Sequence, residues 1–368
     1  AVELVLQKTC FYVESGGQVS DTGVIEGPDW EVTVTDMRRP TEGLIVHVGH
    51  VTWGTLRVGD PVVASVDQER RWDIMRNHTA THLLHRALRQ VLGEHVQQAG
   101  SVVAPDRLRF DFNHGEPMTP EQRAEVERIV TRAILANYPV EAREEKYRDA
   151  LKQGVIALFT EKYGDVVRVL RVGEATDPFS QELCGGTHVK RTGDIGPFLI
   201  LSESGIGAGI RRIEAATGRG ALSAIQALRA RNEEVAATLN CPLDEIGDRV
   251  QRLQEELRQA RREAERLARR LARAEFEALL NQVQEINGIP LLVAQVDAPD
   301  TDTLREMADW FRAKMKGGVV VLGTVINDRP ILIAATTQEL VKTRGVHAGQ
   351  LVRELATVSY THLTLPTN

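Results

Sequence analysis

Four potential metal ligands, arranged in two pairs with the same internal spacing, constrain the fold of this chain more than any other feature. The first pair, His78 and His82, lies in a run with helical apolar spacing, and residues four apart on a helix stand on the same face. The second pair, Cys184 and His188, encloses two glycines, which permit a tight turn that returns His188 toward the Cys184 sulfur. Three imidazoles and a thiolate suit zinc. The sequence therefore predicts one zinc site built from two distant segments.

Neighbouring residues narrow the kind of zinc site. Thr79 follows His78, so the His-Glu-x-x-His motif of zinc proteases is absent and that class of enzyme is disfavoured. His85 could share the helical face of the first pair without being needed as a ligand. Cys10 and Cys241 have no ligand-like neighbours in the sequence and are interpreted as ordinary thiols.

Length and composition indicate a soluble protein of two or three domains. The 368 residues have a mean hydropathy of −0.23 and 26% charged residues, and no apolar run approaches a membrane span. Three cysteines and the lack of a signal peptide favour a reducing cytoplasm. The net charge of −6 argues mildly against nucleic acid as a partner, although Arg211-Arg212 and Lys190-Arg191 could form a local basic stripe. Because the chain opens on Ala1 and a strand-like run, we expect it to be a fragment.

The predicted fold class is α+β, with the first two domains at residues 1–65 and 66–217. Alternating apolar and polar residues between glycine-containing turns predict a β-rich, barrel-like subdomain over 1–65. The second domain mixes helices, expected at 68–93 and 120–137, with strands near 107–112, 154–158, 166–172 and 195–202. An α+β sheet covered by helices fits this pattern and would carry the zinc site.

Residues 218–287 are predicted to form a helical linker. Apolar residues alternate in steps of four and three from Ile246 to Ala278, which is the heptad pattern of a coiled-coil seam. Asn240-Cys241-Pro242 separates this run from an earlier helix. An antiparallel hairpin is one way to bury the seam, and a homodimer through the coiled coil or the C-terminal domain is another possibility.

From residue 288 to 358 the pattern is that of an α/β domain. Strands are expected at 291–294, 319–322 and 331–334, with helices at 303–314 and from His347 to Leu355. The segment Gly205 to Gly209 lacks both the spacing and the lysine of a phosphate-binding loop, so no nucleotide site is expected. Residues 359–368 are threonine-rich and β-branched. We interpret them as a non-native tail that leaves the last domain incomplete.

Four segments resemble the post-catalytic half of alanyl-tRNA synthetase in their order and spacing. They are Phe11 to Gln18 with Asp21-Thr22-Gly23, Asn77 to His85, Cys184 to His188, and Gly207 to Ala215. The resemblance extends as far as residue 217 and, more loosely, as far as residue 358. Threonyl-tRNA synthetase has a related editing module, but a catalytic core follows it there, whereas a coiled coil follows it here.

The resemblance implies an editing domain of alanine–tRNA ligase that hydrolyses Ser-tRNA(Ala) and Gly-tRNA(Ala). It also implies tRNA(Ala) as the partner, a cytoplasmic location, and ATP used only by a ligase core upstream of this chain. A pocket for one methyl group cannot reject glycine or serine strongly enough by binding alone, so a second, hydrolytic site is needed. Zinc could position the substrate or activate water, although four protein ligands are typical of a structural zinc.

The candidate catalytic or serine-reading residues are Thr79, Thr81, Gln18 and Gln98. Gln98 lies in a segment that resembles one near the family's editing pocket, and Ala99 stands where the family often has lysine. Gln18 could equally be a buried glutamine in a β-turn. Two alternatives remain open. One is a free-standing trans-editing deacylase, and the other is a tRNA-binding or dimerising module whose zinc is purely structural.

Overall fold

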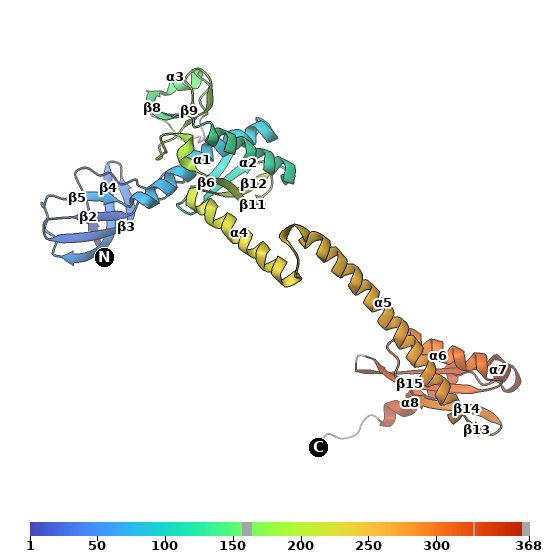
Figure 1. Ribbon diagram of the computed structural model, residues 1–368. Coiled ribbons are helices and arrows are strands. Elements are labelled where there is room, and N and C mark those ends of the chain that lie inside the picture. Colours follow the sequence, from blue (N-terminus) through green and yellow to red (C-terminus); the bar gives the residue numbers. More distant parts are fainter. Residues whose placement is uncertain (157–163, 327, 363–368) are drawn as a thin grey trace. The chain divides into compact units, whose positions relative to one another are not determined.

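The computed structural model describes residues 1–156, 164–326 and 328–362, and the chain divides into two compact units, Ala1–Glu234 and Val235–Asn368 (Figure 1). Helices and strands occur in both units, which confirms the α+β class. The finer domain boundaries expected from the sequence stay predictions. None of the helices in the described ranges is long and apolar enough to span a membrane.

The first unit begins with an antiparallel five-stranded sheet in the order β1-β4-β3-β2-β5. Its strands are β1 (Val2–Leu4), β2 (Gly23–Glu26), β3 (Trp30–Thr41), β4 (Leu44–Gly54) and β5 (Val63–Val66). Its buried core includes Phe11, Ile25, Trp30, Val32 and Val34. The expected barrel is wrong. The short strands β1 and β5 lie at opposite edges, and within the described residues they do not pair with each other.

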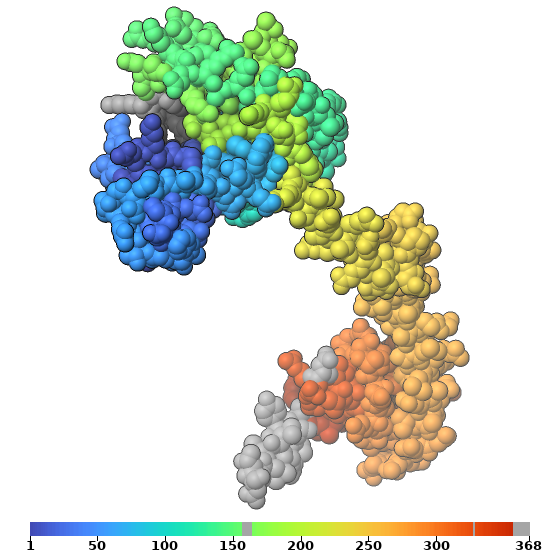
Figure 2. All heavy atoms as spheres, turned by 60° about the vertical axis from the view of Figure 1, so that its left-hand side comes forward, coloured from blue at the N-terminus to red at the C-terminus, as the bar shows by residue number. Residues whose placement is uncertain are grey.

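The same unit continues as a second sheet covered by helices. Helices α1 (Gln68–Leu92) and α2 (Pro120–Leu135) contact each other and the sheet β11-β12-β7-β6 (Figure 1). The strands are β6 (Gln98–Val103), β7 (Leu108–Asn113), β11 (Phe198–Gly207) and β12 (Ile210–Thr217). Leu83, Leu84 and Leu88 of α1 are fully buried in this core with Phe110 and Phe112 of β7. In the space-filling view the blue N-terminal residues lie directly against this part of the unit (Figure 2).

Cap residues set where these helices begin. The Asp67 side chain accepts a hydrogen bond from the Arg70 backbone N–H at the start of α1. Helix α2 begins at Pro120, where the sequence predicts a helix start, and Thr119 forms a reciprocal capping box with Gln122.

A third, antiparallel sheet, β10-β9-β8, brings the second ligand pair to α1. It contains β8 (Val140–Lys146), β9 (Val166–Gly173) and β10 (Pro178–Leu183), with α3 (Tyr147–Lys152) after β8 and the 3-10 turn η1 (Thr192–Ile195) after the ligands. The strands expected at 107–112, 166–172 and 195–202 are confirmed as β7, β9 and β11. The strand expected at 154–158 is reduced to an isolated bridge at Ile156, and residues 157–158 lie outside the described residues.

The second unit holds the long helix and a four-stranded sheet. Helix α4 (Gly218–Leu239) crosses the unit boundary, and the 3-10 turn η2 (Leu243–Glu245) precedes α5 (Ile246–Leu279). The sheet β13-β14-β15-β16 is built from β13 (Gln284–Ile286), β14 (Ile289–Gln295), β15 (Val319–Ile326) and β16 (Arg329–Thr336). The remaining elements are η3 (Leu280–Gln282), α6 (Thr301–Lys314), α7 (Gln338–Arg344) and α8 (Ala348–His362).

The predicted strands and helices of this α/β region are confirmed. Strands β14 and β15 are parallel and α6 connects them, and buried Leu292, Leu304, Phe311 and Leu322 form the core with Phe276 of α5. Helix α8 runs through His362, so it extends past Leu355 and into the first residues of the predicted tail. Residues 363–368 of the predicted tail lie outside the described residues.

The predicted coiled-coil seam does not supply the buried face of α5. The seam residues Leu257, Leu267 and Leu271 are exposed, whereas Ala272 and Phe276 are buried. These last two residues are four apart and pack against α6, with the Phe276 ring 5.9 Å from that of Trp310. These three seam residues therefore remain uncovered by the part of the chain that the structure describes.

Candidate metal centre

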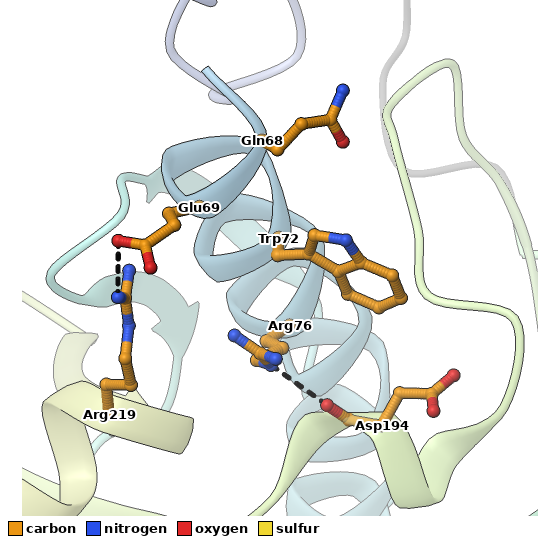
Figure 3. A pocket seen from close by; sticks show the side chains of 6 residues that line it. All are labelled: Gln68, Glu69, Trp72, Arg76, Asp194 and Arg219. Carbon is orange, nitrogen blue, oxygen red and sulfur yellow. Dashed lines mark hydrogen bonds and ion pairs between the residues drawn. The ribbon is translucent and has the colours of Figure 1, made fainter. Parts of the chain in front are cut away.

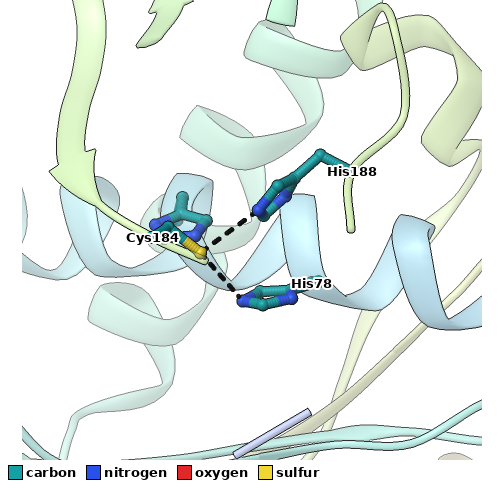
Figure 4. A group of neighbouring side chains, drawn as sticks. His78, Cys184 and His188 are labelled. Atoms are coloured by element: carbon teal, nitrogen blue, oxygen red, sulfur yellow. Dashed lines mark hydrogen bonds between the residues drawn. The ribbon is translucent and has the colours of Figure 1, made fainter. Parts of the chain in front are cut away.

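The structure brings the four predicted ligands together between α1 and the turn that follows β10. The ligand atoms of His78, His82, Cys184 and His188 lie within 4.8 Å of one another. The Cys184 Sγ lies 3.4 Å from Nε2 of His78 and 3.2 Å from Nε2 of His188 (Figure 4). A tetrahedral zinc with bonds of about 2.0–2.3 Å spaces its ligand atoms by about 3.3–3.7 Å. The cluster is therefore compact enough to surround one ion.

Two features hold the turn that carries Cys184 close to α1: hydrogen bonds from Arg168 and a glycine that packs against His78. Arg168 donates from Nη1 to the carbonyl oxygens of Cys184 (2.9 Å) and Gly186 (2.7 Å). A Cβ atom at Gly186 would overlap the His78 ring, so only glycine fits there. This close approach explains why the segment between the two ligands needs glycine.

Each ligand histidine donates its Nδ1–H to a different oxygen. His78 donates to Gln18 Oε1 (2.6 Å), and His82 donates to Glu182 Oε2 (2.6 Å). His188 lies 3.3 Å from the Thr79 hydroxyl, whose own hydrogen goes to the Met75 carbonyl. These contacts fix the tautomer and leave the three Nε2 lone pairs for a metal.

Nε2 of His82 is a further sign that a metal belongs in the cluster. It is buried and, within the described residues, has no hydrogen-bond partner. Buried polar atoms are nearly always satisfied, so an orphaned one calls for an explanation such as an ion. The donor set of three imidazoles and one thiolate fits zinc.

The histidines of the cluster favour the thiolate form of Cys184. Burial alone raises the pKa of the Cys184 thiol, but His78, His188 and His82 outweigh burial and hold that pKa well below its usual range. The thiolate is the form that binds metals. Burial also lowers the pKa of His188 to about 3, against the opposing charge of Cys184.

A buried carboxylate accompanies the ligands. Burial opposes the charge of Glu182, yet His82 and His85 bring its pKa down to about 2. Burial likewise opposes protonation of His82, but Glu182 and Cys184 raise the pKa of His82 to about 10. A metal ion that binds His82 must therefore displace a proton from it, so binding weakens as the pH falls.

A cleft of about 420 Å³ opens beside the cluster. His78, His82 and Cys184 face it, whereas His188 is not among its lining residues. Among the described residues, the other polar or aromatic ones that line the cleft are Tyr12, Ser15, Thr81, Gln98, Ser101 and Arg168. Burial, reinforced by the Cys184 charge, raises the pKa of Tyr12 to about 12, so its hydroxyl stays a neutral donor and bonds the Ser15 carbonyl (2.9 Å).

A second cleft, of about 400 Å³, lies near the N-terminal end of α1, and its lining residues are Gln68, Glu69, Trp72, Arg76, Asp194 and Arg219 (Figure 3). Its cations are paired. Arg219 bonds Glu69 (2.7 Å), and Arg76 bonds the Asp194 carbonyl (2.9 Å). None of the four ligand residues lines this cleft. The chemistry of the unit is therefore concentrated at the cleft beside the metal cluster.

The candidate substrate-reading residues fall into two groups. Thr81 and Gln98 line the cleft, and Gln98 donates to the Ser101 hydroxyl (3.0 Å). Gln18 and Thr79 are fully buried and lie behind the ligands. Gln18 uses both ends of its amide, because Oε1 also accepts from the Thr187 N–H (2.9 Å) and Nε2 donates to the Thr187 hydroxyl (2.9 Å). Both residues therefore contact ligand histidines, and any role toward a substrate stays a prediction.

Two polar residues behind the ligands were not among the sequence candidates. They are Glu182, which precedes the ligand turn, and His85, which the sequence predicts could share the helical face of the first pair without being needed as a ligand. Alternate residues of a strand point to the same side. Glu182 lies near the end of β10, two residues before Cys184, and this spacing is the signal that could have identified it.

Of the basic residues considered for nucleic acid, Arg211 and Arg212 are engaged in ion pairs. Arg212 binds Asp111 through two bonds of 2.7 and 2.9 Å, and Arg211 pairs with Glu203 at 2.5 Å. Both arginines of β12 are therefore paired with neighbouring carboxylates.

Comparisons with known proteins agree with the geometry. Residues 167–214 match the family model described as threonyl and alanyl tRNA synthetase second additional domain, and residues 1–70 match the model described as tRNA synthetases class II (A). The chain is 50% identical over 375 residues to an alanine–tRNA ligase of Roseiflexus sp. (strain RS-1), covering 97% of this chain and 41% of that protein. It is 50% identical over 357 residues to an alanine–tRNA ligase of Myxococcus xanthus (strain DK1622), covering 96% of this chain and 39% of that protein. The chain thus spans about two fifths of the length of these relatives, and it belongs to the alanine–tRNA ligase family.

Proposed function

We propose that this chain carries a zinc-dependent editing site that hydrolyses the ester bond of Ser-tRNA(Ala) and Gly-tRNA(Ala). The observation that supports the proposal is the cleft beside the four-ligand cluster, where three of the ligands meet polar side chains able to read a small substrate. In this proposal tRNA(Ala) is the partner and the cytoplasm the location. ATP-dependent activation of alanine belongs to the part of the relatives that this chain does not match.

The cleft offers the polar groups that such a substrate requires. In this proposal Thr81 and Gln98 contact the amino acid, because both line the same cleft as His78 and His82. When bound, zinc supplies Lewis acidity that polarises a carbonyl or activates a water. The neutral Tyr12 hydroxyl and the Arg168 side chain line the same cleft.

The test is hydrolysis of Ser-tRNA(Ala), Gly-tRNA(Ala) and Ala-tRNA(Ala) by the purified chain. We expect the first two to be hydrolysed and the correctly charged tRNA to be spared. Cys184→Ala should abolish zinc binding and hydrolysis. Cys10→Ala is the matched control, since Cys10 is exposed, is not one of the four clustered ligands, and donates from its sulfur to the Ala64 carbonyl.

The outcomes also separate the alternatives. Zinc binding without hydrolysis of any of the three substrates would favour a tRNA-binding module with a structural zinc. A gene that encodes no class II synthetase core beside this segment would favour a free-standing deacylase.

A further inference from the structure

Glu182 occupies an unusual position behind the metal cluster. Glu182 is only 1% exposed, and both of its carboxylate oxygens accept hydrogen bonds. Oε2 accepts from His82 (2.6 Å), while Oε1 accepts from His85 (2.9 Å) and lies 3.2 Å from the Ser180 hydroxyl. A buried carboxylate is costly unless it is paired and hydrogen-bonded. Here the pairing is complete, and one of the partners is a metal ligand.

The three ligand histidines are not supported alike. Gln18 offers His78 a neutral amide oxygen, and Thr79 offers His188 a neutral hydroxyl at the longer distance of 3.3 Å. Only His82 is backed by a charged group. Hydrogen bonds to an ionised acceptor are shorter and about twice as strong as neutral ones. His82 is therefore the ligand whose ring orientation is held most firmly.

We infer that Glu182 is a positioning residue for the metal centre: it fixes the tautomer and ring of His82, and His85 fixes Glu182 in turn. The inference rests on the metal site of the proposed function. Glu182 does not line the cleft, so it does not touch the substrate. It acts only through His82, by making that imidazole a stronger and better-aligned donor.

His85 completes this arrangement without being a ligand. It is buried, it is outside the four-residue cluster, and its ring lies 5.4 Å from that of Phe110. Its Nδ1–H holds Oε1 of Glu182, so the carboxylate cannot rotate away from His82. His85, Glu182 and His82 are therefore joined by two consecutive hydrogen bonds, and the last of these residues is the metal ligand.

The experiment measures zinc affinity by chelator competition, and the visible absorption bands of the cobalt-substituted chain, for the full chain and for Glu182→Gln. The amide keeps the size of the side chain but loses the charge and one acceptor. Substitutions behind a metal ligand cost about 10–100-fold in affinity, and we expect a loss in that range together with shifted cobalt bands. A folded Glu182→Gln chain with unchanged affinity and unchanged bands would overturn the inference.

Glu203→Gln is the matched control, because the Glu203 side chain is 5% exposed and paired with Arg211 away from the ligands. It should lower thermal stability but leave zinc affinity unaltered. If Glu182→Gln fails to fold, His85→Gln tests the same line of residues with Glu182 intact. We then expect a smaller, severalfold loss of zinc affinity, and an unchanged affinity would contradict the inference.

The readout separates this inference from the proposed function. A wild-type chain that binds zinc but hydrolyses no aminoacyl-tRNA would contradict the proposed function and leave the affinity measurement decisive for Glu182. A wild-type chain that binds no zinc would overturn both.

Discussion

Gly186 shows how closely the residues of the metal centre are packed. It stands between the two ligands of the turn, where a Cβ would meet the His78 ring and come within 2.8 Å of Gln18 Oε1. Gly185, its neighbour, has open space where a Cβ would lie. The same turn therefore contains one glycine that the ligands require and one that they do not.

Gly186→Ala should displace the His78 ring and weaken both the fold and metal binding. Overpacking of this kind costs about 1–3 kcal/mol, and zinc affinity should fall at least tenfold because one ligand is moved. Thermal unfolding and chelator competition measure the two effects. Gly185→Ala is the control and should change neither. Equal behaviour of the two variants would show that the turn yields to the added methyl.

The ligands could be predicted because their spacing is local. His78 and His82 share a helix face, and Cys184 and His188 share one turn, so sequence alone pairs them. The roles of Gln18 and Thr79 could not be predicted, because they depend on contacts with residues far along the chain. Gln18 meets His78 at a separation of 60 residues, and Thr79 meets His188 at 109.

Among the elements, α5 combines a correct prediction with a missed one. The heptad pattern gave the helix, since periodicity reports which residues share a face. It could not report which face meets the neighbouring α6, and that contact uses Ala272 and Phe276. The prediction of a barrel was wrong for a similar reason. Alternation of apolar and polar residues predicts strands, but it does not predict whether the edge strands are long enough to close a sheet.

The exposed seam of α5 predicts association between two chains. Leu257→Glu combined with Leu267→Glu places charges in the seam, where they should dissociate a dimer into monomers because buried charge is unfavourable. Sedimentation velocity measures the mass. The control is Gln251→Glu with Gln259→Glu, which adds the same charge outside the heptad positions. A wild-type chain that is monomeric throughout would contradict a seam between chains.

At the scale of the whole molecule, the metal cluster and its supports belong entirely to one unit. The ligands, the cleft and the cores around α1 and β3 all lie before Glu234, the last residue of the first unit. The second unit has its own core around α6 and β15. The sequence indicated these separate regions through the change from mixed α+β pattern to heptad pattern.

Residues 1–239, which end with α4, should therefore fold and bind zinc without the rest of the chain. We expect the zinc affinity to equal that of the full chain, and the near-ultraviolet circular dichroism of the unit to be retained. Chelator competition on both proteins makes the comparison. A shorter chain that is soluble but binds zinc at least tenfold more weakly would show that the second unit supports the metal centre.

The distance along the chain between the two ligand pairs has a consequence for the lifetime of the fold. His78 and Cys184 are 106 residues apart, and closing a loop of that length in an unfolded chain costs about 4 kcal/mol of entropy. An unfolded chain would therefore hold zinc through one pair at a time, and only the folded chain offers all four ligands. Each tenfold rise in free zinc above the dissociation constant then adds about 1.4 kcal/mol to the stability of the fold. How long the protein survives in a cell would then follow the supply of zinc.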